Sequence, residues 1–178
     1  MRAVLRLTVA IGGCCLLATA ALAHVTLATK EAPAGAEYKA VFRVGHGCKG
    51  SPTVRLSVEV PSGVVAVKPQ PKPGWQIEII KGPYDRAYQL FQSQVTEGVK
   101  VVTWSGGNLP DDYYDEFVLV GHLDKGLEPG TMLYFPVTQT CERGVERWVE
   151  IPAADKTSRD FRAPAPAVKL LPAAEHAH

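Results

Sequence analysis

The sequence predicts an all-β protein, a single antiparallel β-sandwich of the immunoglobulin or cupredoxin type. Its 14 prolines and 16 glycines are spread along 178 residues, a distribution that favours short strands over long helices. Several segments alternate apolar and polar residues with period two, and turn residues separate them. This combination of short alternating strands and frequent turns is typical of sandwiches. No segment beyond the first 23 residues shows a convincing helical pattern.

The first expected strands lie in the first half of the chain. Residues 38–44 alternate imperfectly, whereas 54–60 alternate cleanly until Pro61-Ser62-Gly63 turns the chain. A third strand is expected at 75–79, after Pro73-Gly74.

The later strands follow the same logic. Residues 88–94 and 99–104 are expected to form a hairpin around Glu97-Gly98. Three further strands complete the set, at 116–123, 132–140 and 146–151. The segment 153–178 is rich in Ala and Pro with little periodicity, and predicts a flexible tail. The sandwich is therefore expected to span residues 24–152.

Residues 1–23 have the pattern of a cleaved signal peptide. Arg2 and Arg6 precede an apolar run, and Ala21-Leu22-Ala23 matches the small-x-small cleavage pattern. A membrane anchor is disfavoured because the run is short and lacks a following basic flank. A lipoprotein site at Cys14 is disfavoured because an apolar leader would then remain on the mature protein. The prediction is a periplasmic or otherwise exported protein that begins at His24.

Charge and cysteine content narrow the possible partners. Removal of Arg2 and Arg6 leaves 17 basic against 18 acidic residues, and no basic cluster suggests a nucleic-acid partner. Cys14 and Cys15 leave with the signal peptide. The remaining pair, Cys48 and Cys141, is expected to form a disulfide in an oxidising compartment, in preference to a thiolate copper site.

His24 is the most informative residue, because cleavage would make it the first one. It would then carry a free α-amine and an imidazole, and both can reach one metal ion. The amine has a reference pKa of about 7.7–8.0, so it loses its proton more readily than a lysine amine. Copper(II) binds nitrogen donors more tightly than other first-row divalent ions do. The sequence therefore predicts a copper(II) site at His24.

A second ligand is expected, and His46 is the best candidate. It lies in Val44-Gly45-His46-Gly47-Cys48, where the glycines give the imidazole room and a disulfide at Cys48 would fix the loop. The amine and two imidazoles would form a T-shaped set of three nitrogens suited to copper(II). The alternative is that His46 is an ordinary loop histidine.

Other residues are weaker candidates. His122 lies in an apolar strand and is expected to be structural, and His176 and His178 belong to the tail. The acidic segment 111–116 is expected to be a solvated turn, although Glu116 could supply a carboxylate. Trp75, Trp104 and Trp148 are expected in the core, and one of them could lie near the metal. Met132 is the only methionine after the signal peptide, so soft donors for copper(I) are scarce.

No pattern of a known catalytic site occurs, and we predict a binding protein rather than an enzyme. The chain lacks a CxxC pair, a phosphate-binding glycine loop and a zinc-protease helix. Two alternatives remain: an oxidative enzyme with a histidine brace (one histidine binding copper through amine and imidazole), and a metal-free docking sandwich.

Over about residues 24–152 the chain resembles the YcnI-like copper-binding domains, exported proteins often encoded beside copper-uptake genes. The resemblance rests on the motifs His24-Val25-Thr26-Leu27, Gly74-Trp75, Trp104-Ser105-Gly106-Gly107-Asn108-Leu109-Pro110, Asp115-Glu116-Phe117, Phe135-Pro136-Val137-Thr138-Gln139-Thr140-Cys141 and Arg147-Trp148-Val149-Glu150. It implies a β-sandwich that binds copper(II) through the amine and imidazole of His24, with Trp148 close to the metal.

The chain departs from this family at one ligand. Some members carry a glutamate ligand after the first strand, but here the comparable segment is 45–48, and the next acid is Glu59. Either His46 replaces that carboxylate, or Glu116 or another acid supplies it, and we favour His46. The implied role is a copper carrier, store or chaperone that serves a membrane copper importer or a cuproenzyme.

Overall fold

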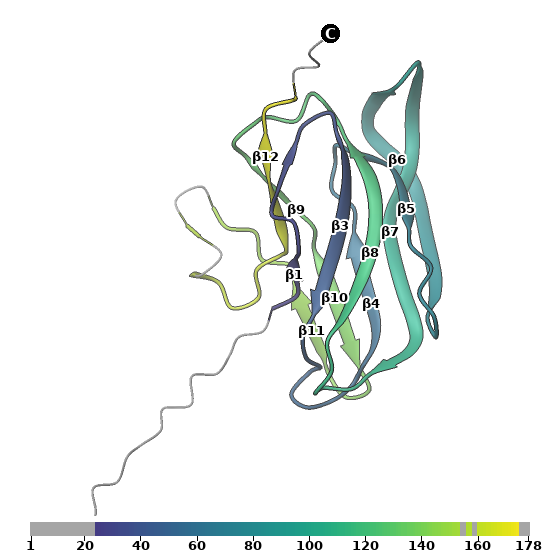
Figure 1. Ribbon diagram of the computed structural model, residues 1–178, viewed down its shortest axis with the longest axis vertical. Coiled ribbons are helices and arrows are strands. Elements are labelled where there is room, and N and C mark those ends of the chain that lie inside the picture. The colour runs from purple at the N-terminus through teal and green to yellow at the C-terminus, as the bar shows by residue number, and fades with distance from the viewer. Residues whose placement is uncertain (1–23, 154–155, 158–159, 175–178) are drawn as a thin grey trace, which may run out of the picture.

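The computed structural model describes residues 24–153, 156–157 and 160–174, which form two packed antiparallel sheets and a smaller third sheet (Figure 1). The predicted signal peptide and the histidines at 176 and 178 lie outside the described residues. The described residues contain no α-helix, and none of their segments is a helix able to cross a membrane. The all-β prediction is confirmed.

Twelve strands make up the three sheets. The first sheet has the order β1 (Thr26–Leu27), β3 (Glu37–Val44), β8 (Asp115–Leu123), β5 (Val64–Pro69). The second has the order β11 (Val145–Trp148), β10 (Val137–Cys141), β4 (Thr53–Glu59), β7 (Ser93–Leu109), β6 (Gln76–Leu90). The third has the order β2 (Glu31–Pro33), β12 (Ala167–Leu171), β9 (Met132–Tyr134), with β2 and β12 parallel.

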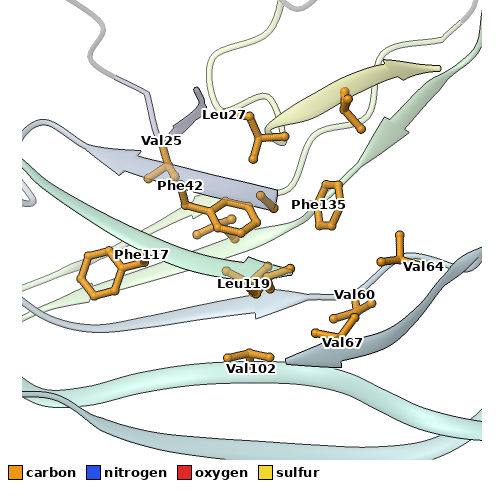
Figure 2. Close-up of a cluster of buried hydrophobic side chains, with 14 of the residues drawn as sticks. Val25, Leu27, Phe42, Val60, Val64, Val67, Val102, Phe117, Leu119 and Phe135 are labelled. Atoms are coloured by element: carbon orange, nitrogen blue, oxygen red, sulfur yellow. The ribbon is translucent and has the colours of Figure 1, made fainter. Parts of the chain in front are cut away.

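The core lies between the first two sheets, where buried apolar residues of β3, β4, β7 and β8 meet. Phe42 of β3 and Phe117 of β8 are fully buried and face Val102 and Trp104 of β7. Figure 2 shows this layer, with Phe135 joining it at the edge of the third sheet. The rings of Phe42 and Phe135 meet edge to face, with centroids 5.7 Å apart.

The predicted disulfide is confirmed. Cys48 and Cys141 are bonded with Cα atoms 5.9 Å apart, and the bond ties the loop after β3 to the end of β10. The two cysteines are separated by 93 positions, so the bond restricts a large loop of the unfolded chain.

The hairpin prediction was wrong about the turn. Strands β6 and β7 form one long hairpin that turns at residues 91–92, because Leu90 pairs with Ser93. Gly98 instead pairs with Gly82 inside the ladder, where the phenol of Tyr84 fills the position that a side chain at 98 would need. Glycine there makes room for a neighbouring ring and does not mark a turn.

The expected strand 132–140 is two strands. It breaks at Phe135-Pro136, so that β9 joins the third sheet and β10 joins the second. Proline lacks the N–H that a continuous ladder needs, which explains the break. The expected strand 146–151 is shorter, because β11 ends at Trp148.

The prediction of a flexible tail from residue 153 was also wrong. Residues 167–171 form β12, the central strand of the third sheet. Val168 and Leu170 are 0% and 2% exposed, so the segment contributes to the core although its alanine and proline content concealed it. The folded unit therefore extends to at least residue 171.

Candidate functional site around His24

His24 lies directly before the edge strand β1, which fixes its position. Val25 and Leu27 are buried and anchor this end of the chain in the core. Thr26 pairs with Arg43 in β3, and Leu27 pairs with Phe42. Extending this antiparallel register by two positions brings residue 24 opposite residue 45, next to His46. The β1–β3 register therefore directs the His24 end of the chain toward the segment that contains His46.

The imidazole of His24 has two contacts in the described structure. Its ring meets Trp148 edge to face, with centroids 5.3 Å apart and planes at 72°. Its Nε2 lies 3.2 Å from the carbonyl oxygen of Arg162. A carbonyl oxygen can only accept, so Nε2 is the donor in this hydrogen bond. Both contacts come from the segment that follows β10.

Gln139 connects Trp148 to the His46 loop. The indole Nε1 of Trp148 donates to Gln139 Oε1 at 3.0 Å, and Gln139 Nε2 donates to the His46 carbonyl at 2.8 Å. The same Nε2 donates to Thr53 Oγ1 at 2.7 Å. Gln139 is 1% exposed, so this network is shielded from water. Sequence analysis missed Gln139, although a polar residue at an inward-facing position of an alternating strand was an available signal.

The backbone of the His46 loop is held from several sides. Gly47 donates its N–H to Asp111 Oδ1 at 2.8 Å, and Cys48 exchanges two backbone hydrogen bonds with Ser51. The His46 side chain is partly buried, and its Nδ1 donates to the Gly47 carbonyl. The disulfide at Cys48 adds a covalent restraint two residues from His46. The loop is therefore well suited to hold an imidazole in one place.

Glu116 is placed with other partners. Its carboxylate pairs with Arg43 at 3.5 Å and accepts a hydrogen bond from the Tyr114 hydroxyl. Glu116 lies on β8 and is paired with Arg43 of the adjacent strand β3, and β3 separates β8 from β1, so Glu116 lies two strands from the His24 end. Its neighbour Asp115 pairs with Lys72 at 2.6 Å. The structure thus does not bring Glu116 to His24.

The remaining candidates have structural surroundings. Trp104 is fully buried, and Trp75 packs edge to face on Phe117 with centroids 4.9 Å apart. His122 lies on β8 with its ring centroid 6.0 Å from that of Phe91. Of the three tryptophans, Trp148 is the one that contacts the His24 ring. This contact identifies Trp148 as the tryptophan beside His24, a choice that sequence spacing left open.

A pocket of about 510 Å³ opens beside His24. Its lining includes His24, Leu27, Met132, Tyr134, Lys156 and Pro164. Within the described part of the chain, no three His, Cys, Asp or Glu side chains are grouped so that they could hold a metal ion. The described residues around His24 therefore do not by themselves form a site of three such side chains.

The fold defines the class of protein: an immunoglobulin-like β-sandwich. A similar solved structure is that of an uncharacterized protein from Nocardia farcinica, described as having an immunoglobulin-like fold. It is 26% identical, with a TM-score of 0.59, and the match covers 83% of this chain and 98% of that one. No curated protein matches the chain.

The chain belongs to the DUF1775 family, described as a domain of unknown function, whose model matches residues 24–170. This is the family of the YcnI-like domains, so the resemblance drawn from the sequence is confirmed. The match starts at His24, and its end within β12 agrees with the extended boundary of the folded unit.

Proposed function

We propose that this protein is an exported copper(II)-binding protein that holds the ion with the α-amine and imidazole of His24. The observation that carries the proposal is the placement of His24. It follows directly on a predicted signal-peptidase site, yet β1 anchors it against the sandwich and its ring contacts Trp148 and the Arg162 carbonyl. A histidine produced by cleavage and held in this way can chelate a metal in one geometry.

The chemistry of the donors favours copper. The α-amine and Nδ1 of one histidine close a six-membered chelate ring on a metal ion, whereas Nε2 points away from the backbone. Nitrogen donors and a scarcity of thioether ligands favour copper(II) over copper(I). His46, whose loop Gln139 and the disulfide restrain, is the proposed further ligand.

The proposed role is carriage, storage or delivery of copper, not catalysis. Export agrees with the disulfide, since such bonds persist in oxidising compartments. A membrane copper importer or a cuproenzyme is the proposed recipient. With copper and ascorbate, we expect no release of oxidised sugars from polysaccharides, and such release would assign the site to an enzyme instead.

The decisive test compares the mature chain that starts at His24 with a variant that carries one extra alanine ahead of it. The extension moves the free amine away from the imidazole, and we expect tight copper(II) binding to be lost. Titration against a competing chelator measures the affinity, and electron paramagnetic resonance counts the nitrogen ligands. Equal affinity of the two proteins would overturn the proposal.

Two histidine variants then locate the second ligand. His46→Ala is expected to weaken binding and change the resonance spectrum, whereas the matched control His122→Ala should change neither. If His46→Ala leaves the spectrum unchanged, the second ligand is not His46, and a carboxylate takes its place in the proposal.

A further inference from the structure

A short segment after β11 is fastened to Glu150. We call residues 162–165 the strap. Glu150 donates its N–H to the Ala163 carbonyl at 3.1 Å, and Ala165 donates its N–H to the Glu150 carbonyl at 2.9 Å. The Glu150 carboxylate accepts a third bond from the Ala163 N–H at 2.5 Å. Pro164 and Glu150 form a parallel bridge at the same place.

The strap and β11 each make one contact with the His24 ring. Glu150 lies two residues after Trp148, the residue whose ring meets His24. The first strap residue, Arg162, presents its carbonyl oxygen to His24 Nε2 at 3.2 Å. One fastening point, Glu150, thus sets the position of the carbonyl relative to the tryptophan.

This hydrogen bond decides where the imidazole proton lies. Because the Arg162 carbonyl can only accept, the bond requires a proton on Nε2. A neutral imidazole has one N–H, so its lone pair is then on Nδ1. Nδ1 is the nitrogen that can close a chelate ring with the residue's own α-amine. Histidines that bind metals usually donate their other ring N–H to a carbonyl or carboxylate, and such partners affect metal affinity.

The geometry points to Glu150 and the strap as a positioning device that fixes the imidazole of His24 in the tautomer needed for metal chelation. This inference rests on the proposed copper site for its purpose, but the tautomer is a property of the metal-free protein. Glu150 is a positioning residue, since it acts through the strap and does not touch the metal. The side chain of Arg162 has no part, because its backbone carbonyl makes the contact.

The test reads the tautomer directly. Nitrogen NMR of the metal-free mature protein, with 15N-labelled histidine at mildly alkaline pH, reports which ring nitrogen carries the proton. We expect His24 to show a single tautomer with the proton on Nε2. The reference is a peptide of residues 24–28, which has no strap and averages over both tautomers.

Two variants remove the same hydrogen bond from opposite ends. Glu150→Ala removes the acceptor, and Ala163→Pro removes the donor N–H. Each is expected to shift the His24 signals toward those of the peptide and to weaken copper(II) binding about 10- to 100-fold. The control Glu146→Ala changes a glutamate of β11, shortly before Glu150 in the chain and without a described contact to the strap, and it should change neither the signals nor the affinity. Thermal unfolding checks that each variant is folded.

The outcomes separate this inference from the proposed function. A wild-type His24 that averages over tautomers as the peptide does would overturn the inference, as would folded variants with unchanged signals. If the tautomer is fixed but copper does not bind, the strap inference stands and the proposed function fails. If copper binds through the amine and the imidazole while the tautomer is averaged, only the strap inference fails.

Discussion

Replacing Gln139 with leucine tests whether one buried amide holds the site together. The substitution keeps roughly the same volume but removes the acceptor for Trp148 Nε1 and the donor for the His46 carbonyl. Each buried polar group left without a partner costs about 1–3 kcal/mol. The more apolar side chain offsets about 1 kcal/mol of this loss. We therefore expect the free energy of unfolding to fall by about 1–5 kcal/mol.

Urea unfolding followed by tryptophan fluorescence measures this change, with circular dichroism as a second probe. The matched control is Gln94→Leu, the same substitution at an exposed position of β7, which should stay within about 0.5 kcal/mol of wild type. Copper(II) affinity should fall in Gln139→Leu alone, because Trp148 and the His46 loop lose their connection. A Gln139→Leu protein as stable as the control would refute the reasoning about this network.

Four further outcomes are expected. Replacing Cys48 and Cys141 with alanine should lower the free energy of unfolding by roughly 4–5 kcal/mol in urea, given their separation of 93 residues. Leu170→Ala should cost about 2–5 kcal/mol in the same assay, since the side chain is buried. Burial raises the pKa of Tyr38 from 10.0 to about 12. The unfolded chain therefore loses this proton first, so stability should decline between pH 10 and 12, and Tyr38→Phe should reduce the decline. Trp148→Phe should retain copper(II) binding but alter the cycling between copper(I) and copper(II), measured by voltammetry.

Each of these has a result that counts against it. A double alanine variant at Cys48 and Cys141 that is as stable as the wild type would contradict the loop argument. The matched control is Lys169→Ala, a change at an exposed position of β12. A Leu170→Ala variant as stable as this control would contradict the conclusion that β12 contributes to the core. If the free energy of unfolding of Tyr38→Phe falls at alkaline pH as much as that of the wild type, the Tyr38 phenol is not the cause of the fall. Unchanged copper cycling in Trp148→Phe would argue against a role for the indole beside the metal.

Strands β4 and β8 were predicted from different signals. In β4 the apolar residues Val54, Leu56 and Val58 alternate with polar ones, and Leu56 and Val58 are buried. In β8 the sequence is an apolar run, and burial alternates along it from Phe117 to Leu123. Strand β5 was missed because it departs from alternation. Its residues Val64 and Val65 are both buried, and Ala66 takes a positive φ of 53° beside a register shift. A bulge of this kind leaves no period-two signal.

The residues around His24 also differ in whether sequence analysis could single them out. His24 is a candidate because the predicted cleavage would give a first residue special chemistry, and Trp148 is one because of the family resemblance; both stay predictions. The strap was not identifiable, since Arg162 contributes a backbone carbonyl, which any residue would supply. The hairpin turn was misplaced for a related reason. Phe91 adopts a positive φ of 50°, a conformation that sequence analysis assigns to glycine.

The parallel pairing of β2 with β12 has a consequence for biogenesis. In its sheet β2 has one neighbour, and that neighbour is formed by residues 167–171, near the far end of the polypeptide. If the chain is exported as proposed, β2 cannot pair with β12 until residues 167–171 have also crossed the membrane. The N-terminal segment 24–33, which carries His24, would then gain this contact late, and loss of β12 would leave β2 without its pairing partner in the sheet.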